Sequence, residues 1–121
     1  MNLTVWVSRA WARLTARGYV RERFHDATLY AYVMRGRDAR PMLIVEADAD
    51  DGCVYRFSMS VDGDLSRRVN DVADGMARVR ADASRDLEQY RTCVTFVAWK
   101  TLHRALSREE KAMFRKYVET T

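Results

Sequence analysis

The spacing of apolar residues changes near residue 64, and this change constrains the fold more than any other feature of the chain. Residues 53 to 61 carry an apolar side chain at every second position, at Cys53, Tyr55, Phe57, Met59 and Val61. Such alternation is typical of a β-strand with one buried face. From Leu65 the apolar residues recur at alternating intervals of four and three, as they do along one side of a helix. The sequence therefore predicts strands followed by helices, which is the α+β class.

Two further strands are predicted before residue 53. Residues 28 to 34 are rich in β-formers, and Arg-Gly-Arg-Asp at 35 to 38 supplies a turn before the apolar residues 42 to 45. A second polar turn, Asp-Ala-Asp-Asp-Gly at 48 to 52, leads into the alternating segment. Together these segments predict a three-stranded antiparallel meander.

Residues 3 to 17 predict an amphipathic helix at the N-terminus. Its apolar side consists of Leu3, Val7, Ala10, Trp11 and Leu14. Gly18 follows where a helix C-cap is expected. The other side of the predicted helix is basic, with Trp6 close to Arg9, Arg13 and Arg17.

The segment after Leu65 predicts two to three helices. An unbroken helix over residues 65 to 103 would be about 58 Å long, against a radius of gyration of roughly 14 Å for a compact chain of this size. We therefore expect a break near residues 82 to 84 and an antiparallel helical pair. Residues 93 to 99 fit either a central helix or a buried fourth strand, and the lack of flanking Gly or Pro favours the helix. A Ser-Arg-Glu-Glu capping box at 107 to 110 opens a last helix.

Length and composition favour one domain that covers residues 1 to 121. The chain has 121 residues, of which 48% are hydrophobic and 31% charged, so it is long enough and apolar enough to bury a core. The predicted fold is an N-terminal helix, a three-stranded antiparallel meander and two to three C-terminal helices packed on one face of the sheet.

Charge is unevenly distributed along the chain. The first 25 residues contain five arginines and one glutamate, whereas residues 26 to 64 contain four arginines and eight acidic residues. Basic terminal helices would attract an acidic protein partner or phosphates. The alternative is a solvated surface that the acidic turns partly balance. The predicted partner-binding residues are Trp6, Arg9, Arg13, Arg17, Arg104, Arg108, Lys111 and Arg115.

A second candidate surface is the apolar stripe that follows residue 64. It consists of Leu65, Val69, Val72, Met76 and Val79, and its spacing is that of a coiled-coil seam. The stripe predicts contact either with another helix of the same chain or with a second copy of the protein.

The sequence contains none of the common catalytic, metal-binding or phosphate-binding motifs. Cys53, Cys93, His25 and His103 lack the spacing of a zinc site. Cys93 and His103 could act as a nucleophile and base only if folding brought them together, because ten residues of helix span about 15 Å. The acidic run at 48 to 51 lacks the glutamate that closes a calcium loop. We therefore predict no metal, no cofactor, no small-molecule substrate and no enzymatic activity.

These patterns lead to two functional hypotheses. The first is a small non-enzymatic protein-interaction module, a regulator, adaptor or inhibitor, and the alternative is a nucleic-acid-binding protein that uses its Arg-rich helices. Arginine outnumbers lysine 18 to 3, a bias of GC-rich genomes that fits a bacterial, phage or viral origin. The longest apolar runs fall far short of the ~20 residues of a membrane-spanning helix. Two cysteines within apolar patterns fit a reducing compartment, so the expected location is the cytoplasm, that of the host for a virus or phage.

Overall fold

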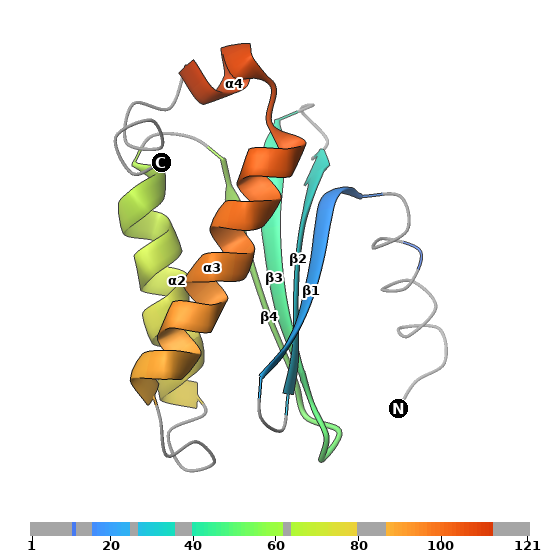
Figure 1. Cartoon of the computed structure of the whole chain (residues 1–121), viewed down its shortest axis with the longest axis vertical. Helices are drawn as coiled ribbons and strands as arrows, with labels where there is room; N and C mark the ends of the chain where they lie inside the picture. The colour runs from blue at the N-terminus through green and yellow to red at the C-terminus, as the bar shows by residue number, and fades with distance from the viewer. Residues whose placement is uncertain are drawn as a thin grey trace.

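The computed structural model describes residue 11 and residues 16 to 24, 27 to 35, 40 to 61, 64 to 79 and 87 to 112. Over these residues the chain forms a four-stranded sheet and then helices, so it belongs to the α+β class (Figure 1). The elements are β1 (Arg17–Phe24), β2 (Ala27–Arg35), β3 (Pro41–Ala49), β4 (Val54–Ser60), α2 (Leu65–Val79), α3 (Leu87–Ala105) and α4 (Arg108–Ala112).

The predicted N-terminal helix and three-stranded meander were wrong, because the first described element is a strand and the sheet has four strands. The strand order is β1-β2-β3-β4, and each neighbouring pair is antiparallel. Sequence reasoning missed β1 because it is an edge strand, in which charged residues interrupt the apolar alternation. Arg17, the last residue of the predicted helix, opens β1. Most of residues 3 to 17 lie outside the described residues.

The two faces of the sheet are fixed by the strand register. Val20, Ala31 and Val45 pair in succession across β1, β2 and β3, and all three are buried. Their face is covered by α2 and α3, which lie antiparallel and side by side (Figure 1). The core therefore lies between the sheet and these two helices, with Leu29, Leu43 and Val94 among its fully buried residues.

The first helix after the sheet, α2, begins at Leu65 as predicted. Asp64 caps α2, because its Oδ1 accepts a hydrogen bond from the Arg67 amide at 3.1 Å. The break expected near residues 82 to 84 lies outside the described residues, between α2 and α3. Residues 93 to 99 are helical within α3, so the alternative of a fourth strand at these positions was wrong. Val94 and Val97 are buried as expected, but Phe96 is 51% exposed.

Among the helices that the structure describes, none combines the length and apolar character needed to cross a membrane.

Candidate functional site

The start of β1 lies directly against the last turns of α3. Gly18 has a positive φ of 67°, and a Cβ at this position would lie 2.5 Å from the Thr101 carbonyl oxygen and 2.8 Å from the Ala105 Cβ. Only glycine fits this conformation and this spacing. The neighbouring Arg17 guanidinium donates a hydrogen bond to the Ala105 carbonyl oxygen, which places a positive charge at the C-terminal end of the helix.

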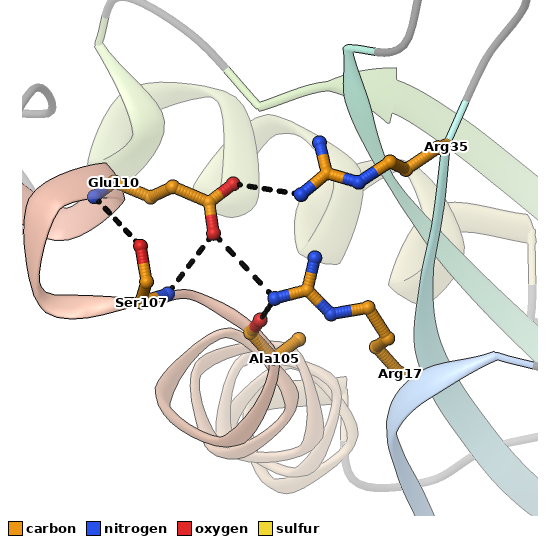
Figure 2. A network of polar contacts seen from close by, with 5 residues as sticks. All are labelled: Arg17, Arg35, Ala105, Ser107 and Glu110. Atoms are coloured by element: carbon orange, nitrogen blue, oxygen red, sulfur yellow. Dashed lines mark hydrogen bonds and ion pairs between the residues drawn. The ribbon is translucent and has the colours of Figure 1, made fainter.

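The carboxylate of Glu110 joins three separate elements at this point (Figure 2). Its Oε1 lies 3.5 Å from Arg17 Nη2 of β1, and its Oε2 lies 3.4 Å from Arg35 Nη2 of β2. The same carboxylate accepts the Ser107 amide at 3.0 Å, and the Glu110 amide donates to Ser107 Oγ at 3.1 Å. These reciprocal bonds confirm the predicted capping box.

The electrostatic state of Glu110 follows from these contacts. The hydrogen bonds from Ser107, first from its amide, lower the pKa of the carboxyl group, and the charges of Arg17 and Arg35 lower it further. The two guanidinium groups remain partly open to solvent, since the Arg17 side chain is 41% exposed and that of Arg35 is 47% exposed. One carboxylate thus contacts two arginines whose side chains remain partly exposed to solvent.

Four of the predicted partner-binding residues gather at this end of the fold. Besides Arg17, they are Arg104, which is exposed and has its Nη1 3.4 Å from the Tyr19 carbonyl oxygen, and two residues of α4, the exposed Arg108 and the half-buried Lys111. The other predicted residues, Trp6, Arg9, Arg13 and Arg115, lie outside the described residues.

Two further basic residues at this end were not predicted. Arg35 closes β2 and contacts Glu110, and the exposed Arg40 immediately precedes Pro41, the residue of β3 that pairs with Arg35. The meander pattern already indicated that both residues flank one turn. It did not indicate that this turn lies at the same end of the fold as α4. We call the whole set the basic end: Arg17, Arg35, Arg40, Arg104, Arg108 and Lys111.

The opposite end of the sheet is acidic and is closed by local contacts. The Gly52 amide donates to the Ala49 carbonyl oxygen at 3.0 Å, and the Cys53 amide donates to Asp51 Oδ1 at 2.9 Å. Asp50 binds the Arg23 guanidinium, with Arg23 Nη1 to Asp50 Oδ1 at 2.8 Å, and this hydrogen bond lowers the pKa of the Asp50 carboxyl group. Asp50 and Asp51 thus have structural roles in and around the turn between β3 and β4.

The apolar stripe at the start of α2 faces the core of the same chain. Leu65, Val69 and Met76 are at most 1% exposed, and Val72 is partly buried against the same cluster. The side chain of Val79 lies outside what the structure describes. The described side chains of the stripe therefore pack against the core of their own chain rather than against a second copy of the protein.

The structure does not bring the candidate nucleophile and base together. Cys93 and His103 both lie on α3, where ten residues of helix separate them by about 15 Å along the axis. Burial raises the pKa of the Cys93 thiol, and the charge of Glu22 adds to this effect. The thiol is therefore protonated near neutral pH, which makes it a poor nucleophile. Within the described ranges, no three His, Cys, Asp or Glu side chains are grouped so as to hold a metal ion.

A buried polar pair on the face of the sheet away from α2 and α3 was also missed by sequence reasoning. The Tyr32 hydroxyl donates to Glu46 Oε1, and both residues are fully buried. Arg56 Nε lies 3.8 Å from the same carboxylate oxygen. Burial, together with Glu46, raises the pKa of Tyr32 to about 12. The phenol therefore stays protonated at neutral pH and acts as a hydrogen-bond donor rather than as a base.

Comparisons of the chain with models of known protein families, with curated proteins and with solved structures gave no match.

Proposed function

We propose that this protein is a small non-enzymatic binding module, a regulator, adaptor or inhibitor, whose basic end docks onto an acidic surface of a partner protein. The observation that carries the proposal is the convergence of β1, β2, α3, α4 and the residue before β3, which together bring six basic side chains to one end of the fold. Because these six basic residues outnumber the acidic Glu109 and Glu110 of α4, the end has an excess of positive charge, which attracts an acidic surface and speeds its association.

The contacts of Glu110 support the proposal further. Arg17 and Arg35 both contact a carboxylate that Ser107 also anchors, so ion pairs restrain their guanidinium groups in the unbound protein. Side chains that are already ordered lose less conformational entropy on binding. Arginine also suits acidic surfaces, because its planar group binds carboxylates through two parallel hydrogen bonds.

The proposal includes a cytoplasmic location, that of the host cell for a viral or phage protein. Its support is the free state of Cys53 and Cys93, which fits a reducing compartment.

The test is affinity capture from native cell lysate, with and without nuclease. We would compare the wild type with Arg104→Glu and Arg108→Glu, which reverse charge at the basic end. Arg78→Glu is the matched control, because Arg78 is exposed in the last turn of α2 and its substitution changes the net charge equally.

A protein partner that resists nuclease, and that is lost with Arg104→Glu and Arg108→Glu but kept with Arg78→Glu, is the expected result. Equal capture by all four proteins would contradict docking through the basic end. Recovery of nuclease-sensitive material alone would replace the protein partner with a nucleic acid.

A further inference from the structure

The outer face of β1 carries tyrosine and arginine side chains in alternation with residues that face the core. Val20 pairs with Ala31 and points toward the helices, so Tyr19 and Arg21 point the other way. Arg21 pairs with Tyr30 of β2, which lies on the same outer face. The rings of Tyr19 and Tyr30 are tilted by 34°, with their centroids 6.2 Å apart.

One arginine lies over this pair of rings, and a second contacts the backbone of Tyr19. Arg21 Cζ lies 6.0 Å from the centroid of the Tyr30 ring, and Arg21 is exposed. Arg104 of the basic end contacts the Tyr19 carbonyl oxygen at 3.4 Å, so the tyrosines adjoin the basic end directly. At the other end of β1, Asp50 neutralises Arg23. The positive charge on the outer face of β1 is therefore confined to the part around Tyr19 and Arg21.

The exposure of Tyr19 makes the β1 edge of this face available to a ligand, whereas Tyr32 and Glu46 further into the sheet are buried. Its side chain and backbone together are 38% exposed, although β1 is paired on one side and α3 packs against its other face. Tyr19 lies at the edge of this face beside the exposed Arg21, and Arg104 reaches the Tyr19 backbone from the helix side of β1.

We propose that this surface of Tyr19, Arg21 and Tyr30 binds single-stranded nucleic acid. A base would stack on the exposed ring of Tyr19, and the phosphates on either side would meet Arg21 and Arg104. Aromatic rings interspersed with arginines are the general means by which proteins hold single strands, since every base has a stacking face. In a duplex those faces are covered by neighbouring base pairs, so a duplex would use only the charges. This proposal goes beyond docking of a protein at the basic end and does not depend on it.

The test is fluorescence anisotropy with labelled oligo(dT) and oligo(U) of about 16 nucleotides, a length that covers the usual site sizes. A duplex of the same length serves as the comparison. We expect the wild type to bind the single strands more tightly than the duplex, with an affinity that falls as salt rises. Tyr19→Ala should weaken binding about tenfold, whereas Tyr19→Phe keeps the ring and should bind like the wild type.

Arg21→Glu should weaken binding and lower the salt slope by about one. The matched controls are Phe96→Ala, which removes an exposed aromatic ring from α3, and Arg78→Glu, which reverses an exposed charge on α2. Both should leave the affinity unchanged. Thermal melting of each variant would show whether it is folded. If Tyr19→Ala does not fold, the comparison of Tyr19→Phe and Arg21→Glu with the wild type still tests the proposal.

Wild-type affinity in both Tyr19→Ala and Arg21→Glu would overturn the proposal. So would equal affinity for single strand and duplex, or no binding at low salt. Protein capture that is lost with Arg108→Glu but kept with Tyr19→Ala would support the docking function whatever the oligonucleotides do. The two proposals can therefore fail separately.

Discussion

The two ends of the sheet are closed by different kinds of contact. At the basic end, Arg17 binds the Ala105 carbonyl oxygen and the Glu110 carboxylate, which lie 88 and 93 positions further along the chain. At the acidic end, the turn between β3 and β4 closes through bonds that span four residues or fewer, such as that from the Gly52 amide to Ala49. The contacts of the first end exist only in the complete fold, whereas the β3–β4 turn is specified mainly by a few neighbouring residues, with Asp50 also reaching Arg23 of β1, 27 positions away.

This difference determines how each end should respond to change. A substitution of Gly18 or Glu110 should disturb several elements together, because Gly18 packs β1 against α3 and Glu110 connects α4 with β1 and β2. A substitution in the β3–β4 turn should disturb the turn and, at Asp50, its ion pair with Arg23 of β1. The candidate docking surface is thus coupled to the stability of the whole domain.

The largest difference between the ends is expected for their two glycines. Gly18→Ala would force a Cβ against Thr101 and Ala105 at a positive φ, and strain plus overpacking should cost about 3 to 5 kcal/mol of the free energy of unfolding. Gly52→Ala meets no atom within 4 Å and has only the positive φ of 92° to oppose it, so its cost should be about 1 to 2 kcal/mol. Urea unfolding measures both values. Equal losses would show that close packing at Gly18 is unimportant.

A smaller effect is expected when the central carboxylate is removed. Glu110→Ala deletes the reciprocal cap of α4 and the shared partner of Arg17 and Arg35, which should cost about 1 kcal/mol. Asp50→Ala removes a carboxylate whose partner is the exposed Arg23, and we expect a smaller loss there. Thermal melting of the two variants makes the comparison. A greater loss for Asp50→Ala would reverse our account of the two ends.

The pH dependence of stability should also contain a contribution from Glu110. Its pKa is lowered in the folded state, so its contribution is present above the ordinary value of 4.5 and is lost as the pH falls through the lowered pKa. The wild type should therefore lose more stability below pH 4.5 than Glu110→Gln, which cannot titrate at this position. Urea unfolding between pH 6 and pH 3, at about one-unit steps, would show this. Parallel profiles for the two proteins would mean that Glu110 has the same pKa in the folded and unfolded states.

The smallest effect is expected for the individual ion pairs. The Arg35 and Arg23 side chains are 47% and 53% exposed, so the coupling energy of each with its carboxylate should be at most about 1 kcal/mol and should fall with salt. Double-mutant cycles with Arg35→Gln and Glu110→Gln, and with Arg23→Gln and Asp50→Asn, measure the two couplings. A coupling several times larger at Arg35 would mean that the Glu110 network is shielded from water more than its exposure indicates.

The parts of the fold that sequence predicted are those with a regular apolar period. β2, β3 and β4 were identified from β-forming and alternating residues, and α2 and α3 from helical spacing. β1 escaped because its exposed face carries Tyr19, Arg21 and Arg23, which leaves too few apolar positions to show alternation. The sequence predicted Gly18 as a helix C-cap, but it lies at an irregularity in β1. Both positions require a positive φ and favour glycine, so the sequence alone does not distinguish them.

The candidate site was predictable only where its contacts are local. Ser107 and Glu110 are three residues apart, and their capping box was recognised from that spacing alone. The contact between Arg17 and Glu110 depends on β1 pairing with β2 and on α3 crossing β1, which the residues themselves do not encode as a pattern. Arg35 was missed for the same reason, since it reaches Glu110 across 75 positions.

The long separation between Arg17 and Glu110 also sets an order of events when the chain is synthesised. At about 5 to 20 residues per second, a ribosome would add Glu110 roughly 5 to 20 s after Arg17. During that interval Arg17 of β1 and Arg35 of β2 lack the Glu110 carboxylate that they contact in the folded protein. The basic end is therefore completed last, because a nascent chain that stops before α3 contains Arg17, Arg35 and Arg40 but neither Glu110 nor the basic residues of α3 and α4.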